Sequence, residues 1–324
     1  MSDYLNNSDI WLIGTGYMGK AYAKILSELS LSYIPVGRSE QSCKEFEDEV
    51  GIKAIEGGFL KWMDGRPKIP SFAIVAVNLD QLAEVTKLLI EYGVKNILVE
   101  KPAALNYSEI SKLEELSKKY GSSVYVAYNR RFYASSLKAL DIIRDEGGVS
   151  SFNFEFTEWS HKIVKLDKPK ADLENWFLAN SSHVVDMAFF LGGKPKKLFS
   201  LVEGSTEWYS KGSKFTGCGV TEDNALFNYS ANWKSPGRWA VEILTDNYRL
   251  IFKPLEKLQI QKLGSIKIEY DESINYDFDE KFKPGLYEQV KAFLNLDSPY
   301  VGNLVKIQEH NLNCQNIYKK IENI

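Results

Sequence analysis

The sequence predicts a two-domain α/β protein, with a parallel sheet in the N-terminal domain and an open, mostly antiparallel sheet in a C-terminal α+β domain. Up to about residue 128, short continuous apolar runs alternate with helical stretches, which is typical of parallel strands buried on both faces. Beyond it, strands such as SFNFEFTEW alternate apolar and polar residues, which indicates a sheet with one covered face. The 324 residues suffice for two hydrophobic cores. We therefore expect domains at 1–128 and 129–324.

The alternation in the N-terminal half predicts right-handed helical crossovers between its strands. Pro35 has no N–H to donate, so we place it near the C-terminal end of the second strand. The expected strands are 10–13, 32–36, 72–77, 96–100 and 124–128, and the clearest helices are 19–29, 79–92 and 107–120.

The C-terminal half combines helices with half-exposed strands. The stretch NSSHVVDMAFFLGG, residues 180–193, predicts a helix that buries one apolar face and ends at Gly192-Gly193. Asp246-Asn247 forms a hairpin turn between two strands. His310 belongs to a polar terminal helix, where we expect it to be exposed. The other expected helices are at about 133–146, 285–296 and 303–322, and the expected strands are 151–159, 226–233, 239–245 and 248–252.

Composition excludes several classes of protein. The formal net charge of −3 provides no basic surface for nucleic acid. Cys43, Cys218 and Cys314 are odd in number and have no CxxC spacing, which indicates free thiols of a reducing compartment and no metal site. The start MSDYLNNSD is not typical of a signal peptide, and no apolar run approaches the roughly twenty residues that span a bilayer. We expect a cytoplasmic protein without a membrane partner.

The motif GTGYMG follows the first expected strand and opens the first helix. Gly14 permits a tight turn, Gly16 lets the backbone approach a pyrophosphate, and Gly19 allows close packing of helix and strand. This context predicts a Rossmann dinucleotide-binding domain, whose helix N-terminus faces the phosphates. The cofactor residues expected from the motif are Gly14, Thr15, Gly16, Tyr17, Met18 and Gly19.

The second strand indicates which nucleotide is bound. An NAD-preferring fold usually has an acidic residue there, but this strand is followed by Arg38 and Ser39. An arginine and a hydroxyl suit a 2′-phosphate, so NADP(H) is favoured over NAD(H), although Arg38 as a solvated surface residue remains the alternative. Val77 and Asn78, at the end of the third strand, complete the expected cofactor site together with Glu100 and Lys101.

The triplet Glu100-Lys101-Pro102 in VEKPAAL supports a more specific identification. With GTGYMG at the start, YNRRF at 128–132 and the helix that contains His183, the chain resembles the glucose–fructose oxidoreductase / inositol dehydrogenase / MocA family. The resemblance implies a Rossmann domain, a second α+β domain whose open sheet mediates homodimers or homotetramers, and NAD(P)-dependent oxidoreduction of sugars, cyclitols or nucleotide sugars.

By this resemblance, Lys101 lies near the nicotinamide and the reacting oxygen, and His183 is its catalytic partner. Hydride transfer at a carbinol carbon needs a group that handles the proton of the oxygen. A lysine whose pKa is lowered by burial can do this, and imidazole exchanges protons near neutral pH. His183 could instead be a structural residue of its helix.

One family residue is missing. The family motif on this helix is Asp-x-x-x-His-x-x-Asp, and this chain matches His183 and Asp186 but has Ala179 at the first aspartate. Asn180 is a possible compensation, and Asp186 either orients His183 or is a solvated carboxylate. The wider set of candidate substrate residues is Asn129, Arg130, Arg131, Trp159, His161, Trp176, Asn180, Asp186 and Arg238.

Two functions remain open at this point. The first is an NADP(H)-dependent oxidoreductase that acts on CH–OH or C=O groups of a sugar or nucleotide sugar, with a non-sugar carbonyl or a tetrapyrrole as variants within the class. The second is a non-catalytic dinucleotide sensor with the same fold. The absent aspartate favours the sensor, and intact Lys101 and His183 favour the enzyme.

Overall fold

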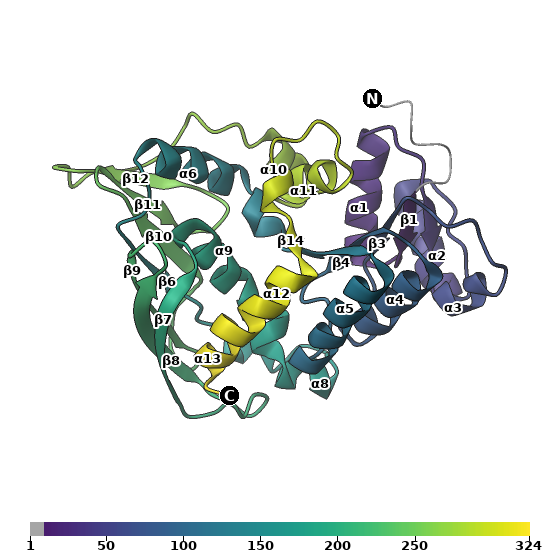
Figure 1. Cartoon of the computed structure of the whole chain (residues 1–324), viewed down its shortest axis with the longest axis horizontal. Helices are drawn as coiled ribbons and strands as arrows, with labels where there is room; N and C mark the ends of the chain where they lie inside the picture. The colour runs from purple at the N-terminus through teal and green to yellow at the C-terminus, as the bar shows by residue number, and fades with distance from the viewer. Residues whose placement is uncertain (1–9) are drawn as a thin grey trace. The chain divides into compact units, whose positions relative to one another are not determined.

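The computed structural model describes residues 10–324; the N-terminal nine residues, where we expected no signal peptide, lie outside the described part. The chain divides into two compact units (Figure 1). The first contains the chain up to Tyr128 and also residues 279–311. The second contains residues 129–278 and 312–324. The segment 279–311, expected in the second domain, therefore belongs to the first unit.

The first unit is built on a six-stranded sheet in the order β14-β5-β4-β3-β1-β2. Its first five strands along the chain pair in parallel, and β14 is added antiparallel to β5. The predicted parallel sheet is confirmed, but β14 was not foreseen. The strands are β1 Ile10–Ile13, β2 Ile34–Val36, β3 Phe72–Val75, β4 Asn96–Glu100, β5 Ser123–Ala127 and β14 Val305–Lys306.

Pro35 lies in the middle of β2 and not near its end. This is possible because β2 is the edge strand of the sheet, where a missing N–H leaves no ladder partner unsatisfied. The Pro35 carbonyl still accepts a hydrogen bond from the Ile55 N–H, at 2.8 Å.

Helices of the first unit connect and cover these strands. α1 packs beside α2 and α11, and α4 packs beside α5. Gly51, Gly93 and Gly121 end α2, α4 and α5 in the left-handed conformation. The helices are α1 Tyr17–Glu28, α2 Glu40–Val50, α3 Gly58–Met63, α4 Leu79–Tyr92, α5 Tyr107–Tyr120, α10 Asp277–Lys281, α11 Leu286–Phe293 and α12 Ile307–Asn313, of which α10 begins and α12 ends in the second unit.

The second unit is built on an eight-stranded sheet in the order β13-β12-β11-β10-β6-β9-β8-β7. Only β6 and β9 pair in parallel, so the predicted, mostly antiparallel sheet is confirmed. The strands are β6 Ser151–Glu155, β7 Pro195–Glu203, β8 Lys214–Thr221, β9 Leu226–Asn232, β10 Ala240–Leu244, β11 Tyr248–Phe252, β12 Gln259–Lys262 and β13 Ile268–Tyr270.

The helical segments of this unit include two π-helical turns. One of them, Phe177–Ser181, runs directly into α9. The segment 303–322, expected as a single helix, instead contains β14, α12, a second π-helical turn and α13. The helical segments are the 3-10 helix Asn129–Phe132, α6 Ala134–Asp145, α7 Ser160–Ile163, α8 Lys170–Glu174, α9 Ser182–Gly192, the π turn Cys314–Tyr318 and α13 Lys319–Glu322.

One face of this sheet is covered by α9, which contacts β6 and β10 (Figure 1). Phe152 and Phe154 on β6 meet Phe189 of α9 edge to face, with both ring centroids 5.7 Å from it. At Gly192 a Cβ would lie 2.4 Å from the Phe152 ring, so the end of α9 approaches the strand closely because it has no side chain there. The other face leaves apolar side chains exposed: Phe199, Leu201 and Leu226.

Among residues 10–324, no helix is long and apolar enough to cross a membrane.

Replacing Gly192 with alanine is expected to lower the free energy of unfolding by about 1–2 kcal/mol, because overpacking against Phe152 exceeds the gain in helix propensity. The matched control is Gly302→Ala, where a Cβ meets nothing within 4 Å. Chemical denaturation of both variants measures the difference. Stability of Gly192→Ala equal to that of the wild type would contradict this account of the packing.

Candidate functional site

The residues predicted to bind a cofactor lie at one edge of the first unit's sheet. Gly14 follows β1, Arg38 comes two residues after β2, Asn78 opens α4 shortly after β3, and Lys101 follows β4. The carboxyl ends of parallel strands share an edge, and ligands of open α/β sheets bind outside it.

The glycine turn brings backbones into close contact. A Cβ on Gly14, whose φ is +116°, would lie 2.2 Å from the Ala76 carbonyl oxygen. A Cβ on Gly19 would lie 2.0 Å from the Gly14 carbonyl oxygen. Gly16 is different, because a Cβ there meets nothing within 4 Å. Packing within the protein thus requires Gly14 and Gly19 to be glycine, whereas Gly16 leaves open space at the start of α1.

A cavity of about 660 Å³ opens at this turn. Its walls come from the turn after β1, the β2–α2 connection and the start of α4. It brings together these predicted cofactor residues: Gly14, Thr15, Gly16, Arg38, Ser39, Val77 and Asn78.

Hydroxyl groups gather beside Arg38 in this cavity. Ser39 caps α2 by accepting a hydrogen bond from the Ser42 N–H at 3.3 Å. The Thr15 hydroxyl donates to Ser42 Oγ at 3.1 Å, and Ser39 Oγ lies 3.0 Å from the same atom. A guanidinium, three hydroxyls and a helix N-terminus form a favourable environment for a phosphate group. Ser42 was not predicted as a cofactor residue, and its contact with Thr15 joins positions 27 residues apart in the chain.

Three of the predicted cofactor residues, Tyr17, Met18 and Gly19, lie outside the cavity lining. Tyr17 is 75% exposed. Lys283, from the segment 279–311, has its Nζ 3.1 Å from Met18 Sδ and 5.1 Å from the centre of the Tyr17 ring. A second lysine therefore lies against the glycine motif. The sequence contains no signal for this contact, because the two segments are 265 residues apart.

Glu100 and Lys101 also lie outside the cavity lining. The Tyr22 hydroxyl donates to Glu100 Oε1 at 2.6 Å. Burial raises the pKa of Glu100, against the opposing effects of this hydrogen bond and of the charges on Lys283 and Lys101. Burial, together with the Glu100 charge, raises the pKa of Tyr22 well above its usual value. Glu100 and Lys101 are both half-buried, and the hydrogen bond from Tyr22 fixes the Glu100 carboxyl group beside the lysine in the chain.

The expectation that His310 is exposed is wrong. Its side chain is fully buried, and its Nε2 lies 3.0 Å from the Pro102 carbonyl oxygen, so Nε2 carries the proton and donates it. The ring also lies 5.5 Å from that of Tyr128. His310 is buried because α12 follows directly on β14, which joins the edge of the first unit's sheet.

The peptide bond between Lys101 and Pro102 of the EKP triplet is cis.

In the second unit, His183 is 8% exposed in the first turn of α9. Its ring centroid lies 6.4 Å from that of Trp239. The guanidinium carbons of Arg130 and Arg238 lie 5.0 and 5.6 Å from the Trp239 ring centre. We call Arg130, His183, Arg238 and Trp239 the Trp239 cluster. Trp239 itself was not predicted as a site residue.

Trp159 extends the aromatic surface of this cluster. It is 42% exposed, and its indole N–H donates to the Gly237 carbonyl at 2.8 Å. Arg238 lies over its ring, 4.7 Å from the centre. Arg238 thus stacks on two tryptophans and leaves its N–H groups available at the surface for a polar ligand.

Arg131 and Asp186 form a buried ion pair. Arg131 Nε donates to Asp186 Oδ2 at 2.8 Å, and Nη2 donates to Oδ1 at 2.7 Å. This bidentate contact joins the 3-10 helix Asn129–Phe132 to α9 within the second unit. Arg131, a candidate substrate residue, is therefore bound to a structural partner within the second unit. Asp186 is not a solvated carboxylate.

Asn180 donates its side-chain N–H to Glu158, at 3.0 and 3.2 Å from the two carboxylate oxygens. Glu158 is 4% exposed and was not predicted, because nothing in the sequence distinguishes it from other acidic residues after a strand. Burial raises its pKa, against the opposing effects of hydrogen bonds and of the Arg238 charge.

The remaining candidate residues are distributed differently. His161 is exposed on α7, Asn129 is buried, and Trp176 is buried edge-on to Trp208 with ring centroids 5.7 Å apart.

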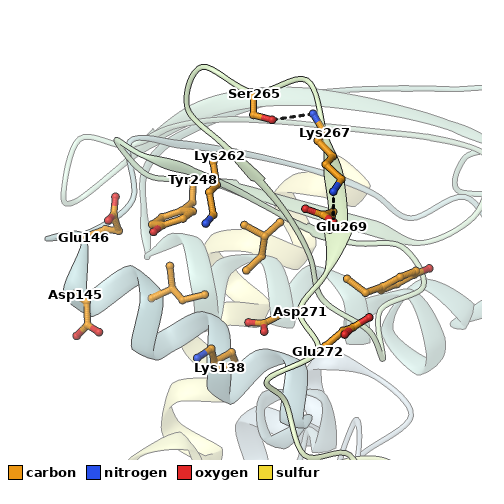
Figure 2. Close-up of a pocket in the computed structure, with 13 residues that line it drawn as sticks. Lys138, Asp145, Glu146, Tyr248, Lys262, Ser265, Lys267, Glu269, Asp271 and Glu272 are labelled. Atoms are coloured by element: carbon orange, nitrogen blue, oxygen red, sulfur yellow. Dashed lines mark hydrogen bonds and ion pairs between the residues drawn. The ribbon is translucent and has the colours of Figure 1, made fainter.

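A larger hollow, of about 850 Å³, lies between α6 and the β12–β13 hairpin (Figure 2). Charges of both signs line it, and Lys267 pairs with Glu269 at 2.6 Å. It contains none of the predicted site residues. Within the described residues, 10–324, no group of three His, Cys, Asp or Glu side chains is placed to hold a metal ion.

Residues 9–128 match a family model described as an oxidoreductase family with an NAD-binding Rossmann fold. No curated protein matches the chain.

Solved structures share the fold over nearly the whole chain. They include an NAD-binding oxidoreductase from Klebsiella pneumoniae (TM-score 0.73, 14% identity, 97% of this chain and 95% of that one). The WlbA dehydrogenase from Chromobacterium violaceum, in complex with NADH and UDP-GlcNAcA, is also similar (TM-score 0.70, 14% identity, 99% of this chain and 95% of that one). A third similar structure is levoglucosan dehydrogenase in complex with NADH and levoglucosan (TM-score 0.71, 17% identity, 96% of this chain and 95% of that one). The match of residues 9–128 to the GFO_IDH_MocA model confirms the resemblance drawn from the motifs of the chain.

Proposed function

We propose that the protein is an NADP(H)-dependent oxidoreductase that transfers a hydride between the nicotinamide and a hydroxyl or keto group of a sugar or nucleotide sugar. The observation that carries the proposal is the strand edge of the first unit, where the glycine turn, Arg38 and Lys101 follow β1, β2 and β4. This arrangement combines a dinucleotide-binding cavity with an ionisable side chain on one rigid sheet.

The residues present fit a dinucleotide. The open space at Gly16 and the N-terminus of α1 suit the pyrophosphate. Arg38, with the hydroxyls of Ser39, Ser42 and Thr15, suits a 2′-phosphate and is the basis for favouring NADP(H) over NAD(H). When bound, the nicotinamide supplies the hydride acceptor or donor.

Lys101 and His183 are the proposed acid–base residues. Oxidation of a hydroxyl releases a proton from oxygen, and reduction of a ketone requires one there. Lys101 follows Glu100 directly in the sequence, and its charge opposes the rise in the pKa of the Glu100 carboxyl group. His183 lies beside Trp239, where the low exposure of the ring limits competition from water. Either group can hold the proton in one direction of the reaction and deliver it in the other.

The Trp239 cluster favours an anionic sugar derivative among the possible substrates. Tryptophan faces suit the C–H surface of a sugar ring, and guanidinium groups pair with phosphate or carboxylate. Trp159 is 42% exposed and offers such a face beside the Arg238 guanidinium, whereas Trp239 is 7% exposed and packs against Arg130. This combination supports a nucleotide sugar over a neutral monosaccharide.

We also propose a homodimer or homotetramer formed through the second unit's sheet. The support is its uncovered face, on which Phe199, Leu201 and Leu226 are 66, 73 and 64% exposed. Exposed apolar groups of this kind, here on β7 and β9 with β8 between them, mark protein contact surfaces.

Gly16→Ala tests the cofactor cavity. The methyl group meets no protein atom, so stability is expected to change by no more than about 1 kcal/mol. Affinity for NADPH and NADH is expected to fall at least about tenfold, because the methyl group occupies space proposed for the pyrophosphate. Gly19→Ala is the contrasting variant and should destabilise the fold. Titration calorimetry and thermal denaturation measure both effects, and wild-type affinity in Gly16→Ala would argue against this binding mode.

Arg38→Ala tests the choice of nucleotide. Loss of a charge-assisted contact is expected to raise the dissociation constant of NADPH about 10- to 100-fold and to leave that of NADH nearly unchanged. Lys44→Ala, which removes an exposed charge from α2, should affect neither. Equal weakening of both nucleotides by Arg38→Ala would remove the basis for an NADP(H) preference.

The activity itself is tested by following nicotinamide absorbance with a panel of sugars and nucleotide sugars. Lys101→Ala and His183→Ala are each expected to lower kcat by at least about 100-fold, and His183→Ala is expected to leave cofactor binding unchanged. Lys112→Ala, on the exposed surface of α5, is the control. Tight binding of the dinucleotide without turnover of any sugar would favour the sensor instead.

A further inference from the structure

Glu158 is a buried carboxylate that the proposed function does not use. It follows β6 and accepts hydrogen bonds from two neutral donors, the Asn180 amide at 3.0 and 3.2 Å and the Ser181 hydroxyl at 2.6 Å. These donors belong to the π-helical turn that leads into α9. One carboxylate therefore holds the residues that immediately precede the helix of His183.

The surroundings of Glu158 are unusual for a residue with only a structural role. A buried carboxylate loses its hydration, and neutral donors compensate for that loss only in part. Burial accordingly raises the pKa of Glu158, and the Arg238 charge is among the effects that oppose the rise. Perturbed carboxyl groups of this kind gather at functional sites.

The connection from Glu158 to His183 is short. Asn180 precedes His183 by three residues and lies in the π-helical turn that continues directly into α9. Ala179, one residue before Asn180, offers no polar group on this turn. Glu158 thus brings a carboxylate to the turn before α9 from a different element, whereas Asp186, on α9 itself, is paired with Arg131.

We propose that Glu158 is the positioning residue of His183: it fixes the turn from which the helix of His183 begins and supplies the carboxylate that position 179 lacks. The inference rests on the proposed function, in which His183 exchanges the substrate's proton. Asn180 is then the link between the two groups and not itself the replacement for a carboxylate.

The first test does not depend on turnover. The chain has three histidines, so their ring signals can be followed separately by NMR of ¹⁵N-histidine-labelled protein. Glu158→Gln keeps the size of the side chain and one acceptor oxygen but removes the charge. We expect it to shift the ring resonances of His183 and to leave those of His310 in place.

The matched control is Glu322→Gln. Glu322 is also a buried carboxylate of the second unit, bonded to the Tyr209 hydroxyl and 3.6 Å from Lys211 Nζ. Its replacement should leave the His183 resonances unchanged. Unshifted His183 signals in Glu158→Gln, or an equal shift in Glu322→Gln, would overturn the proposal. A protein that shows the expected shifts but oxidises no sugar would instead count against the proposed function.

The second test is kinetic and uses a rescue. Glu158→Ala is expected to lower kcat by up to about 100-fold, with little change in KM, because a misplaced imidazole impairs the chemical step more than binding. Ala179→Asp added to this variant should recover at least part of the lost kcat by returning a carboxylate to the same turn. A fall in kcat that parallels a fall in thermal stability and is not rescued by Ala179→Asp would contradict a positioning role. A rise in KM alone would contradict it as well.

Discussion

The close approach of backbones at Gly14 is the constraint on which the first unit's chemistry depends. With no Cβ, Gly14 approaches the Ala76 carbonyl after β3, and Gly19 in turn packs on Gly14. These contacts fix where α1 begins, and the start of α1 forms one wall of the cavity whose other walls carry Arg38 and Asn78. A larger residue at either tight position would move the helix and with it the positive end that we propose binds the pyrophosphate.

In the second unit, a buried ion pair fixes the positions of the segments that carry the candidate site residues. Arg131 and Asp186 hold the 3-10 helix Asn129–Phe132 against α9 through two hydrogen bonds. Breaking one partner of such a pair leaves an uncompensated buried charge and costs about 3–5 kcal/mol. The neighbouring residue, Arg130, is thereby held over Trp239, beside which His183 lies. Arg130, proposed to bind an anionic substrate, and His183, the proposed acid–base residue, thus depend on the same anchor.

Local patterns predicted those parts of the molecule that depend on neighbouring residues. The continuous apolar runs of β1, β3, β4 and β5 and the glycine turn required no distant partner to be recognised. The strands β7 and β8 carry charges and the glycines Gly217 and Gly219, so they present no apolar run. The two-residue strand β14, Lys283 beside Met18 and the burial of His310 arise from contacts across more than 170 residues. No periodicity in a single sequence encodes such contacts.

The position of Glu158 changes how the incomplete helix motif should be interpreted. The motif Asp-x-x-x-His-x-x-Asp detects only carboxylates that lie close to the histidine in the sequence. By this motif, Ala179 indicates that a catalytic carboxylate is missing, which favours a sensor. Glu158, from the segment after β6, accepts hydrogen bonds from Asn180 and Ser181 of the same turn, and the motif cannot detect it because it lies elsewhere in the sequence. What an acid–base residue needs is a charge and a fixed orientation, and neither depends on which element provides them. The absence of an aspartate at position 179 therefore does not by itself weigh against catalysis.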